Sequence, residues 1–391
     1  PPVLLYDGGV EQSGIMRMVL ANVRTPEERR GDLNAQLAAL RVGETRIHEL
    51  AARFGVGGLK EGLSAILAYS ERRMLKRLAE LPPGRYVADD WLDDDGSSPE
   101  RVMIKVAVEV SPERLVFDFE GTAPQRRGNV NAVKPMTHSA VFYAIKILTD
   151  ATLPPNAGVL RPVEIRIPPG SFLDARAPAA VCAGNTETTQ RVADTVLRAF
   201  AQIAPDRIAA ASQGTMNLIG IGGRDPRSTR AYTYIETIGG GQGGRPYGQG
   251  MHGVHANMSN TLNTPVEALE ISYPLRVERY ELREGSGGGG RHAGGEGLIR
   301  AITAIDHEAR VSLQSDRRLT GPYGLHGGAS GATGQNSVRD RQGKVTALPG
   351  KGSVTLAPGE TVIVETPGGG GWGAPQAADS RLSVAAARAD A

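Results

Sequence analysis

The chain has 391 residues, of which 40% are hydrophobic and 22% charged, a composition typical of a globular protein with room for two or three packed units. Its 44 basic and 42 acidic residues leave a net charge of +2, which argues against nucleic acid or an anionic membrane as a partner. No apolar run approaches the ~20 residues of a membrane-spanning helix, and no signal peptide is recognisable. The single cysteine, Cys182, excludes an internal disulfide and fits a cytoplasmic location.

Residues 1–85 predict a helical hairpin. The stretch "TPEERRGD" at 25–32 has a capping threonine, an early proline and two glutamates, which is typical of a helix start. Apolar residues then recur at helical spacing in two stripes, which the glycine-rich residues 55–58 separate. The stripes are Leu33, Leu37, Leu40, Ile47, Leu50 and Phe54, then Leu63, Ile66, Leu67, Met74 and Leu78. We expect two long helices joined by a short glycine turn.

Residues 86–270 favour a mixed α/β region. The acidic run "ADDWLDDDGSS" at 88–98 lacks the spacing of a calcium loop, because Trp91 and Val102 stand where oxygen ligands are needed, and is interpreted as a solvated loop. The segments "VMIKVAVEV" and "LVFDFEG" that follow predict a β-hairpin with one buried face. Further along, residues 137–150 and 188–203 favour helices, and "VEIRI" favours a strand between them.

Short strands with frequent glycine dominate the C-terminal part of the chain. Residues 271–375 therefore predict a β-rich region, and the last segment, 376–391, predicts a loose tail because it has little to bury. The expected fold class is α+β or mixed α/β, with an N-terminal helical hairpin, an α/β middle and a β-rich C-terminal half.

Several mechanisms lack their sequence signatures. The chain contains no "GxxxxGK[ST]" phosphate loop, no "GxSxG" elbow and no "HExxH" motif. A "GxGxxG" spacing begins at Gly239, but Pro246 and the glycines around it prevent the helix that a dinucleotide site requires. The sequence itself therefore points to no nucleotide site.

The segment "YIETIGGGQGGRPYGQGMHGVHANMSNT" at 234–261 combines eight glycines with polar side chains. Glycine allows close approach of the backbone to a ligand or to a neighbouring chain, at a cost in folding entropy. We interpret this segment as site-forming and subunit-contacting, and the alternative is a tightly packed crossover. Its polar members are Glu236, His255, Asn257 and Asn260, and its loop glycines are Gly239, Gly240 and Gly241.

Two histidines in that segment lie three residues apart. A metal held by His252 and His255 alone stays an open alternative, because such sites usually recruit further ligands nearby. For His252 a hydrogen bond to the backbone of a packed loop is the preferred interpretation. His255 lies where small and polar residues alternate, which favours a ring that points into a cleft.

A second polar cluster, "CAGNTETTQR" at 182–191, comes directly before a predicted helix. Asn185 or Thr186 is suited to cap that helix. Capping leaves Glu187 and Thr188 unexplained, and a helix N-terminus rich in hydroxyls and amides also suits an anion or a carbonyl group. Both interpretations remain open.

The chain resembles the hydantoinase B/oxoprolinase family from about residue 1 to residue 373. The resemblance is carried by "LANVRTPEERRGDLNAQLAALRVG", by "GNTETTQRVADTVLRAF" and by the long stretch from "ETIGGGQGG" to "RHAGGEGL". This family includes B subunits of ATP-dependent N-methylhydantoinases, parts of 5-oxoprolinases and subunits of acetone and acetophenone carboxylases. The opening "PPVLLYDGG" reads like the interior of a longer protein, and we expect an upstream segment that is removed or separate.

The resemblance implies a division of labour. An ATP-binding partner of the hydantoinase A type phosphorylates the carbonyl oxygen, and the B-type subunit completes the chemistry. It also implies a divalent metal held mainly outside this chain, in an upstream N-terminal segment of the B-type subunit that is rich in His and Asp. The metal ligands within this sequence are unknown.

The function that we predict is hydrolysis of a cyclic amide, such as a hydantoin or 5-oxoproline, as a subunit of an ATP-dependent complex. Two side chains are candidates for proton transfer, namely Glu187 and His255. The candidate substrate-binding residues are Asn185, Thr188, Glu236, Asn257 and Asn260. The rival predictions are a subunit of an ATP-dependent ketone carboxylase and a non-catalytic scaffold subunit.

Overall fold

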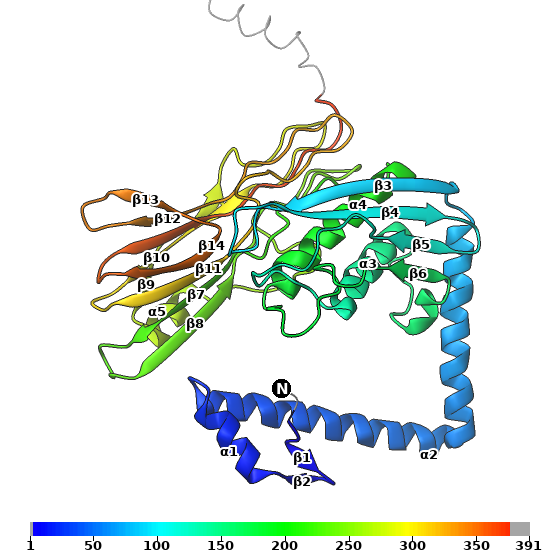
Figure 1. The fold of residues 1–391 in the computed structure, drawn as a ribbon, viewed down its shortest axis with the longest axis horizontal. Coiled ribbons are helices and arrows are strands. Elements are labelled where there is room, and N and C mark those ends of the chain that lie inside the picture. Colours follow the sequence, from blue (N-terminus) through cyan, green and yellow to red (C-terminus); the bar gives the residue numbers. More distant parts are fainter. Residues whose placement is uncertain (1–2, 376–391) are drawn as a thin grey trace, which may run out of the picture.

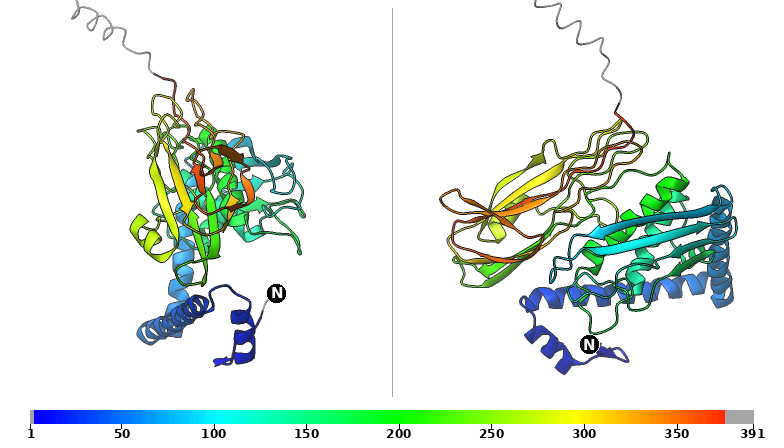
Figure 2. Two further views of the ribbon diagram at one scale, coloured as in Figure 1. Left: turned by 90° about the vertical axis from the view of Figure 1, so that its left-hand side faces the viewer. Right: turned by 45° about the horizontal axis from the view of Figure 1, so that its top comes forward.

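The computed structural model describes residues 3–375 and has the predicted α+β class. Figure 1 shows three parts: a β-sandwich on the left, an α/β lobe on the right and an L-shaped helical arm below them. The left-hand view in Figure 2 also shows the N-terminal part of the arm below the other two parts. The predicted tail at 376–391 lies outside the described residues.

The arm begins with a small hairpin of β1 (Tyr6–Asp7) and β2 (Val10–Glu11), followed by α1 (Ser13–Ala21). The long helix α2 (Pro26–Leu78) then changes direction at Gly55, whose φ of 74° and ψ of 155° are not helical. Both predicted helices therefore exist, but the predicted hairpin is wrong, because the two halves of α2 form an L and do not fold back on each other (Figure 1).

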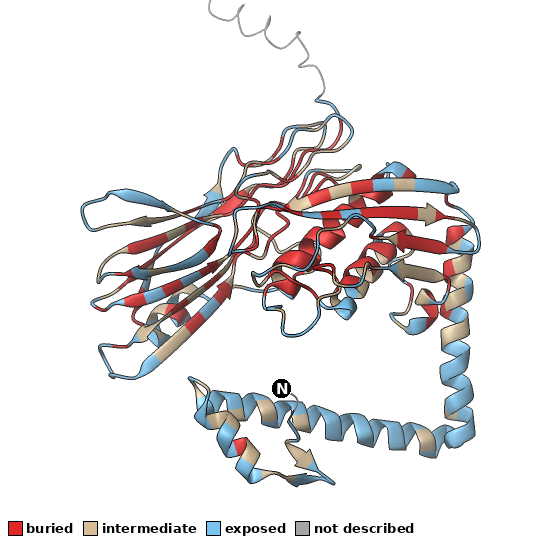
Figure 3. Ribbon diagram, in the orientation of Figure 1, coloured by how far each residue is buried: buried red, intermediate tan, exposed pale blue. Residues whose placement is uncertain are grey.

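The apolar stripe of the first half of α2 consequently has no cover within residues 3–375. Leu40 is 71% exposed, Ile47 60% and Phe54 55%. Figure 3 shows the same region in the colour of exposed residues, whereas Met74 and Leu78 at the end of α2 are buried in the α/β lobe. The helical spacing was thus correct, but it did not reveal what the stripe packs against.

The α/β lobe contains a four-stranded sheet in the order β3-β4-β5-β6, in which β5 and β6 are parallel and the other neighbours antiparallel. Helix α4 lies against this sheet, and Phe200 packs edge-on to Phe117 with ring centroids 5.9 Å apart. The elements of this lobe are β3 (Gly84–Leu92), β4 (Val102–Val110), β5 (Leu115–Asp118), α3 (Lys134–Leu148), a 3₁₀ turn (Ala157–Leu160), β6 (Val163–Arg166), a π-helical turn (Gly184–Thr188) and α4 (Thr189–Ile203).

The β-sandwich consists of two antiparallel sheets, with orders β14-β11-β7-β8 and β13-β12-β15-β10-β9. Their facing side chains, such as Ile221, Val311, Ile302 and Val364, form a second core. The sandwich begins at β7, earlier than the predicted boundary at 270. Its elements are β7 (Leu218–Arg224), β8 (Ala231–Thr237), α5 (Val266–Ser272), β9 (Leu275–Arg283), β10 (Gly297–Ala304), β11 (Ala309–Gln314), β12 (Gln335–Arg339), β13 (Val345–Leu348), β14 (Lys351–Leu356) and β15 (Thr361–Glu365).

Glycine-rich segments from four parts of the chain run side by side at the end of the sandwich. They are joined by backbone hydrogen bonds: the N–H of Gly244 donates to Gly370 O at 2.8 Å, that of Gly369 to Gly295 O at 2.9 Å, and that of Gly295 to Gln242 O at 2.8 Å. Side chains would prevent such close packing of backbones. We call residues 239–253, 286–296, 321–334 and 366–373 the glycine threads.

Candidate functional site

A cluster of buried charged side chains joins the α/β lobe to the β-sandwich. Asp316 lies in the turn after β11, and its Oδ1 is 2.9 Å from an Arg191 nitrogen of α4, while its Oδ2 is 2.7 Å from Lys351 Nζ. Arg317 lies 2.8 Å from Asp90 at the end of β3 and 3.0 Å from Asp194 of α4. We call these six residues and Glu187 the junction cluster.

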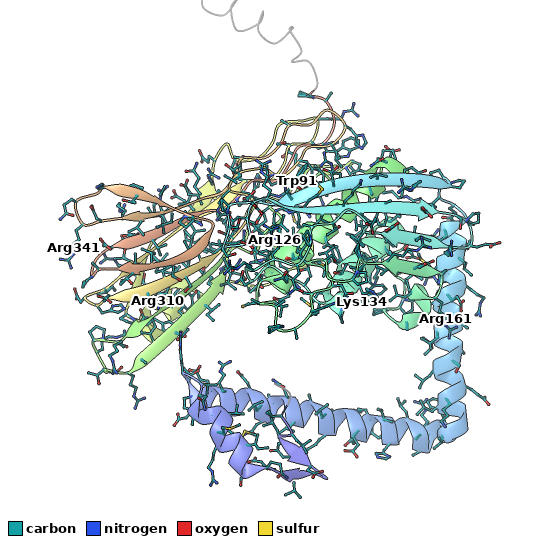
Figure 4. All side chains as sticks on the ribbon, in the orientation of Figure 1. Trp91, Arg126, Lys134, Arg161, Arg310 and Arg341 are labelled. Atoms are coloured by element: carbon teal, nitrogen blue, oxygen red, sulfur yellow. The ribbon has the colours of Figure 1, made fainter. Side chains whose placement is uncertain are left out.

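The acidic run at 88–98 contributes to this junction, so its interpretation as a solvated loop is wrong for several of its members. Asp93, which is 2% exposed, accepts hydrogen bonds from the N–H of Arg318 at 2.5 Å and of Leu319 at 3.1 Å. Asp95 accepts from the N–H of Ser98 at 2.7 Å, and Arg126 approaches Asp95 to 3.7 Å. Figure 4 shows Arg126 where the two parts meet. Buried carboxylates need such partners, and these come from distant segments.

Glu187 is the member of the junction cluster with no partner. It lies on the π-helical turn that precedes α4 and is fully buried, yet neither carboxylate oxygen has a hydrogen-bond partner among the described residues. Burial, together with the nearby Asp316 charge, raises the pKa of Glu187 to about 7. A π-helical turn is frequently a functional feature, and a carboxyl with this pKa exchanges its proton near neutral pH.

The other carboxylates of the cluster differ in their ionisation. Burial alone would raise the pKa of Asp316, but Lys351 and Arg191 lower it to about 2. For Asp194, burial outweighs the attraction of Arg317 and Arg191, so its pKa is raised. The cluster thus holds Asp316 firmly ionised beside a protonatable Glu187.

The two predicted residues beside Glu187 differ in their surroundings, and their role in substrate binding stays a prediction. The hydroxyl of Thr188 donates to the backbone oxygen of Val130 and is fully buried. Asn185 is exposed, and its backbone oxygen accepts a hydrogen bond from Thr189 at 2.8 Å. The predicted capping by a side chain is not observed for α4 either. Glu187 is buried with unused oxygens on its carboxyl group, and Gln190 Nε2 and Arg191 Nε of the same sequence cluster are also buried without a hydrogen-bond partner among the described residues.

Glu236 is fully engaged in an ion pair. Its two oxygens accept from the guanidinium of the buried Arg300 at 3.0 and 2.9 Å, and Tyr234 donates to it as well. The Arg300 guanidinium also lies 4.4 Å from the centroid of the Tyr280 ring. A bidentate pair of this kind supports a structural role for Glu236.

His255 and Asn260 come together along one hollow of about 620 Å³, which Thr264 and Tyr280 also line. The ring of His255 lies 3.2 Å from Ser259 Oγ through Nδ1, whereas its Nε2 has no hydrogen-bond partner among the described residues. Burial lowers the pKa of His255, which favours the neutral ring at pH 7. A neutral imidazole beside a hollow can accept a proton.

Two further polar residues of segment 234–261, Asn257 and His252, do not line the hollow beside His255. Asn257 has a φ of 57° and faces a different hollow, where its amide nitrogen donates to Asp194 at 2.8 Å. His252 accepts a hydrogen bond from the N–H of Glu296 at 2.9 Å, in agreement with the preferred interpretation of that ring. The predicted polar residues of 234–261 therefore serve an ion pair and two separate hollows.

The loop glycines are required for close approach, and their close neighbours lie within the same chain, as in the alternative of a tightly packed crossover; approach to a ligand or a neighbouring chain stays a prediction. A Cβ on Gly239 would meet Gly253 O at 2.9 Å, one on Gly240 would meet Gln213 Oε1 at 2.1 Å, and one on Gly241 would meet Gly295 O at 2.0 Å. None of the three has a positive φ, so space and not backbone conformation demands glycine here. Gly239 approaches Gly253 within its own thread, Gly240 approaches the side chain of Gln213, and Gly241 approaches Gly295 and Gly369 of two other threads.

The described residues offer no ready metal site. Among residues 3–375, no three His, Cys, Asp or Glu side chains converge as metal ligands. The residues present therefore do not fit the divalent metal that the resemblance implies, and we derive no step through it. Within the same range, no helix has the length and apolarity needed to cross a bilayer.

The chain belongs to the hydantoinase B/oxoprolinase family, whose sequence profile matches residues 1–375. Two relatives illustrate this. 5-oxoprolinase 1 of Arabidopsis thaliana is 38% identical over 90% of this chain, and the B-type subunit of a putative D-/L-hydantoinase from a Pseudomonas species is 32% identical over 95% of it. The chain spans 28% of the first protein and 64% of the second.

Two solved structures share the fold. The ATP-dependent caprolactamase from Pseudomonas jessenii matches 99% of this chain with a TM-score of 0.87 and 26% identity, and this chain covers 68% of it. An acetone carboxylase matches 94% of this chain with a TM-score of 0.84 and 14% identity, and is covered to 56%. The second likeness concerns the fold alone.

Proposed function

We propose that this chain is a subunit of an ATP-dependent cyclic-amide hydrolase of the hydantoinase/oxoprolinase type. In this proposal a hydantoinase A-type partner subunit phosphorylates the amide carbonyl oxygen, and this chain completes the hydrolysis. The observation that carries the proposal is the match of 99% of the chain to a caprolactamase, an enzyme whose name states ATP dependence and a cyclic amide. The 5-oxoprolinases and the B-type hydantoinase chain among its relatives support the same reaction class.

The division of labour follows from amide chemistry. Resonance makes an amide carbonyl a poor electrophile, whereas phosphorylation of its oxygen creates a leaving group that water can displace. The second subunit must then position the water, stabilise the tetrahedral intermediate and exclude bulk solvent. These tasks need hydrogen-bond donors and a proton acceptor in a hollow, and they need no nucleotide site on this chain.

His255 is the described residue best suited to accept the proton from water. Its neutral ring and its place beside a hollow with Asn260 support this role, which requires the buried and unpartnered Nε2 to become accessible to the water. Glu187 has a suitable pKa but no exposed surface, so we assign it a positioning role through the junction cluster. A divalent metal, if the complex uses one, would be held mainly by residues outside 3–375.

The test is product analysis of the complete complex. Incubation with ATP and a panel of cyclic amides, including a hydantoin, 5-oxoproline and caprolactam, should release ADP and the ring-opened carboxylate. Labelled bicarbonate and a ketone such as acetone, added to the same mixture, should not react with each other. Incorporation of the label into a ketone, with every cyclic amide left intact, would instead establish the carboxylase reaction and refute the proposal.

A further inference from the structure

A second hollow, of about 210 Å³, lies between helices α3 and α4 and the loops that begin at 207 and 242. Tyr143 and Asp194 line it from the two helices, and Arg207, Ser212, Gln242 and Arg245 line it from the loops. It is distinct from the hollow that holds His255, since the two share no lining residue.

Two arginines bring positive charge to this hollow without compensation. Within residues 3–375, neither Arg207 nor Arg245 is within 4.0 Å of a carboxylate. Arg245 donates only to the backbone oxygen of Gln249, at 2.9 and 3.2 Å, and Arg207 only to that of Leu148, at 3.3 Å. A carbonyl dipole does not neutralise a guanidinium charge, so both arginines can pair with an anion.

The one carboxylate that lines the hollow is already engaged. Asp194 Oδ1 accepts from the amide nitrogen of Asn257 at 2.8 Å, and Oδ2 accepts from Arg317 at 3.0 Å. The Asn257 amide oxygen in turn accepts from the Tyr143 hydroxyl at 3.3 Å. The bonds from Asn257 and Arg317 occupy both oxygens of Asp194. They leave this carboxylate little capacity to attract a cationic ligand.

The polar groups that remain are mostly donors. Ser212, which is 5% exposed, accepts from the N–H of Gly243 at 3.2 Å and keeps its hydroxyl proton for a ligand. Gln242 accepts from the N–H of Met251 at 3.2 Å, so its amide hydrogens remain available. Two guanidiniums, a hydroxyl and an amide around a partly open hollow of this size, with Arg207 exposed at its edge, suit a small oxyanion.

We propose that this hollow binds the carboxylate group of the ring-opened product after the product leaves the hollow that holds His255. This inference rests on the proposed function, because ring opening of a cyclic amide generates a carboxylate. Arg207 and Arg245 pair with its two oxygens, and Ser212 and Gln242 donate further hydrogen bonds. Inorganic phosphate, the other oxyanion that such a reaction releases, has similar chemistry and is the competing ligand.

Calorimetric titration of the purified protein with glutarate, without ATP or partner, tests the assignment. Glutarate should bind saturably, and the neutral glutaramide should not. Arg207→Met and Arg245→Met, which keep the aliphatic stem, should each weaken glutarate binding by at least about tenfold. Arg230→Met, at an exposed arginine in the β7–β8 turn, is the matched control and should leave the affinity unchanged.

Several outcomes would overturn the inference: no glutarate binding, equal affinity in all three variants, or phosphate binding that glutarate does not displace. Thermal melting of each variant shows whether a lost affinity reflects lost folding, and the two arginine positions provide independent tests. Because the titration needs no turnover, its failure is separable from that of the proposed function. A complex that opens no cyclic amide would refute the function even if glutarate binds.

Discussion

Glu187 is a protonatable group in the protein interior. The free energy of unfolding should therefore depend on whether this carboxyl is charged. Its pKa is about 7 in the folded chain against an ordinary value of 4.5. Below pH 4.5 the carboxyl is protonated in both states. Between pH 4.5 and about 7 the unfolded chain loses the proton while the folded chain keeps it, so stability falls as pH rises and then levels off.

We predict that Glu187→Gln removes this loss of stability between pH 4.5 and about 7. Between pH 4.5 and pH 8, the difference in unfolding free energy between the variant and the parent protein should change by about 2–3 kcal/mol in favour of the variant. Urea unfolding at the two pH values measures this, with Glu113→Gln on the exposed turn before β5 as the control. An equal effect of Glu187→Gln at both pH values would show that the carboxyl does not ionise as its burial implies.

His255 should act in ring opening, the step that follows phosphorylation of the carbonyl oxygen. We predict that His255→Gln lowers ring opening by the complete complex by about 10²-fold, because positioned proton acceptors contribute 10²- to 10⁴-fold. ATP cleavage by the partner should fall less, so that ADP release exceeds ring opening. His48→Gln, on the exposed arm, provides a matched control. If ring opening is unchanged in both His255→Gln and Glu187→Gln, the chain serves as a scaffold.

At the scale of elements, the glycine threads depend on contacts that leave no room for a methyl group. We predict that Gly241→Ala lowers the melting temperature strongly or prevents folding, because its Cβ would lie 2.0 Å from Gly295 O and 2.1 Å from Gly369 N. Gly289→Ala is the matched control in the same threads, since nothing lies within 4 Å of its Cβ. Equal melting temperatures for the two variants would contradict the close packing.

How far the sequence predicts these elements depends on the range of the interactions involved. Alternation in 102–110 and helical spacing in 188–203 report which face a segment buries, so β4 and α4 were predictable. The turn at Gly55 was also visible, but its direction was not, because the partner of the exposed stripe with Leu40 and Ile47 is not among the described residues. Local periodicity shows that a face is apolar and does not identify its neighbour.

At the candidate site, too, sequence patterns did not identify contacts between distant segments. Glu187 was identified because polar residues cluster before a predicted helix. The loop glycines were identified because so many glycines in one segment cost folding entropy. The junction cluster was missed, since Asp90 and Arg317 lie 227 positions apart and only the fold joins them. A signal was present in the acidic run at 88–98, where failure to match a calcium loop was interpreted as exposure. Carboxylates can instead be buried against arginines from a distant strand end.

At the scale of the whole molecule, the chain has the fold of a caprolactamase but spans 68% of that protein, and the described residues do not supply a metal site. The proposed function assigns the ATP step to another subunit. We therefore predict that the 391-residue chain alone neither consumes ATP nor opens a hydantoin ring. A hydantoinase A-type partner should be needed for both activities.

The most direct test of this division of labour is to measure ADP release and ring opening in parallel, first with the purified chain and then with each component restored. The account predicts no activity from the chain alone, little ring opening from the partner alone and coupled ADP release and ring opening only when all parts are present. Ring opening by the chain alone, at a rate that matches the complete complex, would contradict it.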